Sequence, residues 1–213
     1  MVKLTQTKMV SDRGYNVDET VYTWTVDDFI DYIKENMDDA EHRNEISPIH
    51  SVLTQVYVNT EGKKILVYYG TRGDVMSIPI TVVDSFIKKA FENKVSEAIL
   101  IVDAHLSSDS SKALTKMSSS KCRCQIFEES ELTYSSIASN DVPLQVKLTK
   151  EEAYIKMKQL KAGSNRLLIL NMADPVVKYY GWQPGDMIKV FRDDSALNIL
   201  SPKYYNYRVV VNK

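Results

Sequence analysis

Residues 173–181 read Ala-Asp-Pro-Val-Val-Lys-Tyr-Tyr-Gly, and this short stretch decides the fold of the C-terminal third of the chain. Asp174 suits the N-cap of a helix, because its carboxylate can accept a hydrogen bond from an unpaired amide of the first turn. Pro175 suits the first helical position, and Gly181 suits the left-handed residue that ends many helices. We therefore predict a short helix here. Its two adjacent tyrosines cannot face the same way, so at least one is expected in the core.

Further elements surround this helix. Thr149 and Glu152 form a capping box, which predicts the start of another helix. Residues 187–192 and 205–211 alternate as strands do, and a turn rich in Pro and Gly precedes the first of them. The pattern changes near Pro143, where we place a domain boundary. Residues 143–213 are thus predicted to form a small α+β domain.

The first 142 residues alternate between strand and helix patterns. Residues 52–58 and 65–69 flank an Asn-Thr-Glu-Gly turn and predict a β-hairpin. Residues 98–102 form a continuous apolar run, which is typical of a strand buried on both faces. Helices are expected over residues 21–39 and 79–93 and up to Met117, and a third core strand over 125–127. This order predicts an α/β domain with parallel strand pairing over residues 1–142.

Charge is distributed unevenly between these two parts. Residues 143–213 hold 12 of the 27 basic and 6 of the 28 acidic residues, so residues 1–142 hold 15 basic and 22 acidic ones. The asymmetry indicates either different partners or an accident of surface composition. No apolar run is long enough to span a bilayer, and the N-terminus lacks the apolar core of a secretory signal. We expect no membrane partner.

The chain contains two cysteines, Cys122 and Cys124, which are poorly spaced for an ordinary disulfide. This usage is typical of a reducing intracellular compartment. A structural zinc site needs four ligands, and the three histidines show no paired spacing. The alternative, which needs no metal, is that Cys124 begins a buried strand and Cys122 lies in the preceding turn.

Several short motifs follow one another across residues 144–210. They are Leu-Thr-Lys-Glu-Glu at 148–152, Asp-Pro-Val with a basic and aromatic run and Gly at 174–181, Gly185 with Ile-Lys-Val-Phe-Arg at 188–192, and Tyr204, Tyr207 and Arg208 at the close. Each motif is weak alone. In this order and spacing they resemble the C-terminal domain of the shared fifth subunit of eukaryotic nuclear RNA polymerases, and the smaller archaeal counterpart of that domain.

The N-terminal part supports the eukaryotic form of this resemblance. Residues 11–17 read Ser-Asp-Arg-Gly-Tyr-Asn-Val and resemble that subunit's Asp-Arg-Gly-Tyr motif, in a domain that the archaeal counterpart lacks. The buried strand at 98–102 and the Ser-containing helix start with Lys112 resemble its central segment. Because the motif lies close to residue 1, we expect the family's usual first helix to be shortened or missing.

The chain also departs from the family pattern. Residues 167–170 read Leu-Leu-Ile-Leu where the family has Leu-Pro-Arg-Ile, and residues 193–198 replace a Pro-Ser-Glu-Thr-Ala-Gly loop. These changes indicate a distant relative, from a divergent protist or from a large DNA virus that carries its own polymerase. The location implied is the nucleus for a cellular protein, and the virion and host cytoplasm for a viral one.

The resemblance implies a non-catalytic subunit of a multisubunit DNA-directed RNA polymerase, with no catalytic residue, cofactor or metal of its own. Its C-terminal domain would dock on the largest subunit, among other polymerase subunits. Its N-terminal domain, an endonuclease-like mixed sheet with helices, would form part of the lower jaw near downstream duplex DNA. The expected assembly interface comprises Asp174, Pro175, Val176, Tyr179, Tyr180, Gly181, Lys189, Arg192, Tyr204 and Arg208.

Weak, non-specific DNA contacts are expected at a helix N-terminus, which favours anions. The DNA-proximal candidates are Ser108, Ser110, Ser111 and Lys112; the alternative is a Ser-rich loop that merely caps its helix. The acidic surplus of this part argues against tight DNA binding. Arg13 is another candidate contact, although a structural ion pair with Asp12 or another acid is the favoured interpretation.

Two rival functions remain open at this stage. The first is a metal-dependent nuclease, because Glu61-Gly62-Lys63 matches the Glu-x-Lys of a catalytic motif, yet no Pro-Asp pair precedes it at a suitable spacing. The second is a free-standing DNA-binding or regulatory protein, which predicts strong, salt-dependent DNA binding by the isolated chain.

Overall fold

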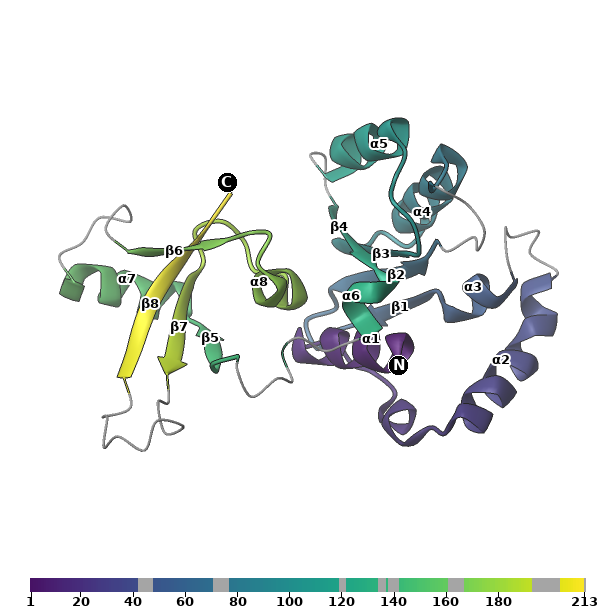
Figure 1. The fold of residues 1–213 in the computed structure, drawn as a ribbon, viewed down its shortest axis with the longest axis horizontal. Helices are drawn as coiled ribbons and strands as arrows, with labels where there is room; N and C mark the ends of the chain where they lie inside the picture. The colour runs from purple at the N-terminus through teal and green to yellow at the C-terminus, as the bar shows by residue number, and fades with distance from the viewer. Residues whose placement is uncertain are drawn as a thin grey trace. The chain divides into compact units, whose positions relative to one another are not determined.

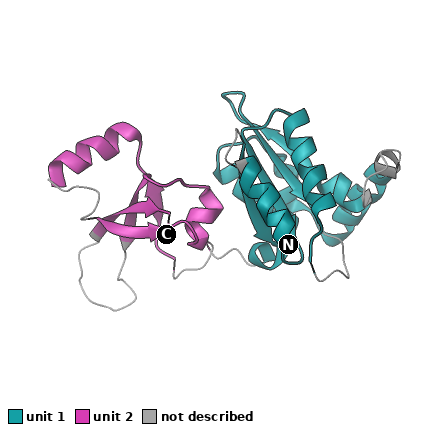
Figure 2. Cartoon of the chain, turned by 90° about the horizontal axis from the view of Figure 1, so that it is seen from above, with its two compact units in different colours: residues 1–134 teal, residues 135–213 magenta. Residues whose placement is uncertain are grey.

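A computed structural model of the chain describes residues 1–41, 48–70, 77–118, 122–133, 137, 142–160, 167–192 and 204–212. The chain divides into two compact units, unit 1 over residues 1–134 and unit 2 over residues 135–213 (Figure 2). The boundary between the units thus lies nearer the N-terminus than the one that we predicted at residue 143. Ile137 and Val142 pack against the core of unit 2, which explains why the segment before Pro143 groups with that unit.

Unit 1 is built on a four-stranded sheet with the order β1-β2-β3-β4. The strands are β1 (Gln55–Val58), β2 (Lys64–Tyr69), β3 (Glu97–Val102) and β4 (Arg123–Glu128). β1 and β2 form the predicted antiparallel hairpin, and Gly62 in its turn has a φ of 76°. β2–β3 and β3–β4 are parallel, which confirms the predicted α/β pairing.

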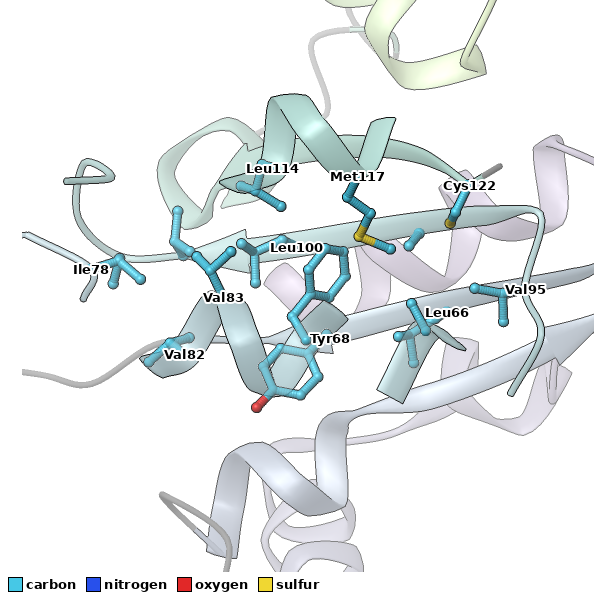
Figure 3. Packing of buried hydrophobic residues seen from close by; sticks show 14 residues of the cluster. Leu66, Tyr68, Ile78, Val82, Val83, Val95, Leu100, Leu114, Met117 and Cys122 are labelled. Carbon is cyan, nitrogen blue, oxygen red and sulfur yellow. The ribbon is translucent and has the colours of Figure 1, made fainter. Parts of the chain in front are cut away.

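Helices cover both faces of this sheet (Figure 1). α4 (Ile80–Glu92) and α5 (Ser108–Ser118) cover the face that carries Leu66, Tyr68, Ala98 and Leu100. Figure 3 shows this core, in which Val83 and Leu114 of the helices meet Leu100 of β3. α1 (Val2–Asp12) and α6 (Glu129–Thr133) lie side by side on the other face. The remaining elements are the 3-10 helix η1 (Glu19–Thr23), α2 (Val26–Glu41) and α3 (Pro48–Leu53).

Helix α1 shows that a first helix is present, and its predicted shortening relative to the family stays a prediction. It spans 11 residues and buries Met9 and Val10 together with polar residues such as Gln6 and Thr7. Because several of its buried positions are polar, the helix has no clean apolar stripe that a periodicity search could detect.

Unit 2 contains a second four-stranded sheet with the order β5-β7-β8-β6. Its strands are β5 (Gln145–Lys147), β6 (Leu168–Asn171), β7 (Met187–Arg192) and β8 (Tyr204–Val211), and its helices are α7 (Lys150–Leu160) and α8 (Pro175–Tyr180). β7 is antiparallel to β5 and β8, whereas β6 is parallel to β8. The structure is therefore mixed α/β with two units, as predicted at that level.

The predicted endonuclease-like character of unit 1 stays a prediction. Within the described part of the chain, every helix is too short or too polar to cross a membrane.

Candidate assembly face

Helix α8 forms where the sequence predicts it. The Asp174 carboxylate accepts a hydrogen bond from the amide of Val176 at 2.9 Å, and Pro175 occupies the first turn. Gly181 has a φ of 64° and a ψ of 31°, the left-handed conformation expected at the end of the helix. The Asp174-to-Gly181 segment is thus a helix defined by its own caps.

Most of this segment lies inside unit 2. Val176 and Tyr179 are 7% and 6% exposed, and Gly181 is buried as well. The Tyr180 ring is partly buried and stacks on the ring of Trp182, with centroids 4.9 Å apart and planes at 10°. The expectation that at least one of the adjacent tyrosines is core is confirmed by Tyr179. Val176, Tyr179 and Gly181 are thus buried within unit 2, and their place in the assembly interface stays a prediction.

A group of aromatic and basic side chains lies on the opposite face of the same sheet. Lys189 pairs with Tyr207, and Phe191 pairs with Tyr205, across the antiparallel β7–β8 ladder. Residues that pair directly share one face of a sheet, whereas the alternate residues on β7, including the core residue Val190, point to the other face. We call Lys189, Phe191, Tyr205 and Tyr207 the aromatic face.

The side chains of the aromatic face contact one another. The Phe191 and Tyr205 ring centroids are 6.4 Å apart, and those of Tyr205 and Tyr207 are 5.7 Å apart. The Lys189 Nζ lies 4.3 Å from the Tyr205 centroid and 4.6 Å from that of Phe191. Such geometry is a cation–π contact. Lys156 of α7 extends the group, because its Nζ lies 4.8 Å from the Tyr207 centroid.

The remaining predicted interface residues divide between the two faces of the sheet. Of the ten, Lys189 alone belongs to the aromatic face as defined. Arg208 pairs with the core residue Ile188 and so lies on the α8 side. Arg192 and Tyr204 form the last pair of the β7–β8 ladder, and their side chains lie outside the part that the structure describes.

Sequence reasoning missed Phe191 and Tyr205 and quoted Tyr207 only as a motif residue. The signal was present in the strands themselves. In 205–209 the odd positions hold two tyrosines and a valine, and period-two alternation alone places them on one face.

The predicted DNA-proximal residues lie at the start of α5, but they differ in exposure. Ser110 is fully buried, and its hydroxyl donates to the carbonyl of Ile78 at 2.9 Å, so it is not available to a phosphate. Ser107, which we had not selected, caps the helix by accepting from the Ser110 amide at 3.2 Å. Ser108, Ser111 and Lys112 are exposed, and the Lys112 Nζ lies 3.4 Å from Asp109 Oδ1. The capping alternative therefore accounts for Ser110.

Arg13 of the Asp-Arg-Gly-Tyr motif has a structural role. Its side chain is 3% exposed, and its Nη1 lies 3.6 Å from the carboxylate of Glu97, which also pairs with Arg123. Gly14 has a φ of 86°, and Tyr15 then forms a bridge to Asn59 beside the hairpin turn. The motif thus joins the end of α1 to the sheet and offers no guanidinium to DNA.

The proposed nuclease residues do not converge on a cation site. Glu61 lies in the exposed hairpin turn, where its carboxylate pairs with the Lys63 ammonium at 2.7 Å. That contact, with its hydrogen bond, lowers the pKa of the Glu61 carboxyl. No group of three metal-ligating side chains occurs among the residues described. Cys122 lies just before β4 and is buried, and Cys124 lies in β4 and packs against the same core, which agrees with the predicted strand and preceding turn.

Comparison with known proteins finds similar sequences. Residues 137–210, almost the whole of unit 2, match the family described as RNA polymerase Rpb5, C-terminal domain. Unit 2 is therefore similar to the C-terminal domain of Rpb5. Subunit RPABC1 of DNA-directed RNA polymerases I, II and III from Caenorhabditis briggsae is 25% identical over 99% of this chain and 94% of its own length. The DNA-directed RNA polymerase subunit 5-like protein 1 of Arabidopsis thaliana is 23% identical over the same shares.

The resemblance inferred from the sequence motifs is therefore confirmed. A further relative, subunit rpabc1 of Dictyostelium discoideum, is 25% identical over 65% of this chain and 68% of its own length. The Rpb5 relatives are named as polymerase subunits, which agrees with the prediction that the chain is an accessory subunit and not itself an enzyme. The departure at residues 167–170 lies in β6, where Leu168 and Ile169 are 56% and 50% exposed.

Proposed function

We propose that this chain docks on the largest subunit of a multisubunit RNA polymerase through the aromatic face of unit 2. The observation that carries the proposal is the exposure of this face on the unit that matches the Rpb5 C-terminal domain. Tyr205 is 51% exposed although it sits in the middle of a ring cluster. Tyrosine is one of the residue types that carry most of the binding energy at protein interfaces.

Apolar surface continues beyond the four residues of the aromatic face. Val146 of β5 pairs with Lys189 and is 43% exposed, and Leu144, beside Phe191, is 65% exposed. Val209 and Ile169 pair on the same side of the sheet, and Ile169 is half exposed. Contiguous apolar surface of this kind marks interaction sites on soluble proteins. A protein partner that covers it would remove these side chains from water.

We further propose that unit 1 forms part of the lower jaw beside downstream DNA. Ser108, Ser111 and Lys112 remain candidates for phosphate contacts, because they are exposed at the start of α5. Lys112 shares its charge with Asp109, so any contact is weak. A jaw that the polymerase holds in place needs little affinity of its own, since tethering supplies a high effective concentration. The chain would follow its polymerase to the nucleus, or to the virion and host cytoplasm if a large DNA virus encodes it.

The test is co-purification of the tagged chain from its native source, followed by mass spectrometry. We expect the two large polymerase subunits to be recovered in similar amounts to the chain. A chain that runs alone on gel filtration would contradict the proposal. DNA binding by the isolated chain separates the rivals: a free-standing binder predicts tight, salt-dependent binding, and a nuclease predicts Mg²⁺-dependent cleavage that Glu61→Ala abolishes. We expect neither.

A further inference from the structure

Unit 1 contains a hollow that neither the polymerase assignment nor the DNA contacts use. Its volume is about 510 Å³, and it is lined by parts of α1, α3 and α6, the 3-10 helix η1 and the start of α2. Most of its wall is apolar, including Val21, Leu53 and the rings of Trp24 and Phe29. The Trp24 ring lies 4.8 Å from the ring of Tyr32 and 6.4 Å from that of Phe29, so the aromatic wall is held together by its own contacts.

Apolar side chains of this wall also reach the surface. Val26 is 75% exposed and Ile49 is 45% exposed, and both line the hollow. Ile30 is one turn along α2 from Val26 and is 42% exposed. The hollow is therefore open to a partner at a rim of bulky aliphatic residues, as a groove for large apolar side chains would be.

Acidic residues outnumber basic ones around the hollow, and Glu129 lies in its wall. The segments 18–33, 48–58 and 128–133, which supply most of the wall and rim, contain no Lys or Arg, and Lys34, the next residue of α2, pairs with Asp31 at 3.2 Å. Their eight acidic residues are Asp18, Glu19, Asp27, Asp28, Asp31, Glu128, Glu129 and Glu131.

The basic groups in the wall are the α-amino group of Met1, Lys3 and His50, and they offset only part of this negative charge. Burial lowers the pKa of Lys3 to about 7, and its Nζ already donates to Gln55 Oε1 at 2.8 Å and to the Tyr57 hydroxyl at 3.1 Å. Burial also lowers the pKa of His50, which is therefore mostly neutral at pH 7. The hollow thus has an apolar interior and a surround in which carboxylates outnumber cations, which we call the acidic rim.

We propose that this hollow binds a short amphipathic segment of another protein, which inserts bulky apolar side chains and pairs flanking Lys or Arg with the acidic rim. An apolar groove that takes large side chains at helical spacing is a recurring mode of peptide recognition. Charge complementarity predicts that the bound segment is basic, because an acidic segment would face like charges across the rim. This inference stands apart from the docking of unit 2, since every lining residue belongs to unit 1.

Two designed peptides test the proposal on the full-length chain. The first is a fluorescent peptide of roughly 15 residues with leucines at i, i+3, i+4 and i+7 and lysines elsewhere, and the second replaces each lysine by glutamate. Fluorescence anisotropy should show saturable binding of the basic peptide, at least about tenfold tighter than the acidic one and weakened by salt. Equal binding of the two peptides, or binding of neither, would overturn the proposal.

Surface variants locate the binding. Val26→Lys and Ile49→Lys change exposed side chains, so they leave folding intact while they place charge at the rim. Each should weaken the basic peptide about tenfold or more. Phe91→Lys is the matched control, because Phe91 is 54% exposed on α4, which covers the opposite face of the sheet. Unchanged binding by Val26→Lys and Ile49→Lys, or an equal loss in Phe91→Lys, would contradict the assignment.

Other occupants give distinct results. If decanoate shifts the Trp24 emission and the basic peptide does not bind, the hollow is a lipid-like site and the proposal fails. If the chain dimerises on gel filtration and Val26→Lys abolishes the dimer, a second copy is the occupant and the proposal fails as well.

Discussion

The Asp174-to-Gly181 segment and the aromatic face belong to the same small unit, but the segment is largely buried and the face is exposed. The segment identifies the family, and most of its large side chains are buried, Val177 completely. The aromatic face lies across the sheet from it, with Tyr205 half exposed. A segment that is easy to recognise in a sequence need not be the segment that touches a partner. Here the recognisable helix packs against one face of the sheet, and the residues that we propose as contacts lie on the other face.

The largest expected effect comes from truncating a core side chain of unit 2. Trp182 is 6% exposed and stacks on Tyr180. We expect Trp182→Ala to lower the free energy of unfolding of unit 2 by roughly 3–5 kcal/mol, because it leaves a cavity in a small core. Urea unfolding monitored by circular dichroism measures the change. A loss of unfolding free energy below about 1 kcal/mol would show that Trp182 is not part of a packed core, and the contrast between a core face and an exposed face would fail.

A second effect compares two lysines in different surroundings. Lys3 is 7% exposed and burial lowers its pKa from 10.5 to about 7, whereas Lys189 is partly exposed over aromatic rings. Between pH 7 and about 10 the unfolded chain binds a proton at Lys3 that the folded chain does not, so this group makes stability rise with pH. The total change approaches a few kcal/mol, at about 1.4 kcal/mol per pKa unit.

Replacement of Lys3 tests this directly. Lys3→Met should flatten the rise in the urea midpoint between pH 7 and 9.5, a range that stays below the raised pKa values of Tyr57 and Tyr69. The reference variant is Lys189→Met, which should keep the slope of the wild type. Equal slopes for the wild type and Lys3→Met would show that Lys3 is charged in the folded chain.

A smaller effect is expected at the cap of α8. Asp174→Ala removes the hydrogen bond to the Val176 amide and should cost about 1 kcal/mol of stability. Asp174→Asn keeps an acceptor and should recover most of that loss. If both variants reduce partner binding more than their stability loss explains, Asp174 contacts the partner and the cap is only part of its role.

The sequence predicted those elements that carry local signals. The caps at Asp174 and Gly181 and the apolar run of β3 were sufficient to place α8 and a buried strand. Helix α1 was missed because its buried Lys3 and Gln6 are stabilised by distant residues on β1 and β2. Ser110 was misassigned for the same reason, since its partner Ile78 lies 32 positions away in the chain.

The candidate site was predicted only in part. Lys189 was selected from the sequence, but the rings that surround it come from two strands whose pairing no local pattern specifies. Strand alternation groups residues within one strand, and it cannot say which strand of a domain lies beside which. The hollow in unit 1 was not foreseen either, because five separated segments of the chain form it.

The central claim is that the aromatic face binds the largest polymerase subunit, and capture of that subunit by the immobilised chain tests it most directly. Tyr205→Asp combined with Lys189→Glu should reduce capture at least about tenfold, while the urea midpoint stays within error of the wild type. Phe91→Asp, an equally exposed aromatic position on unit 1, should capture normally. Normal capture by the double variant, or an equal loss in Phe91→Asp, would contradict the account.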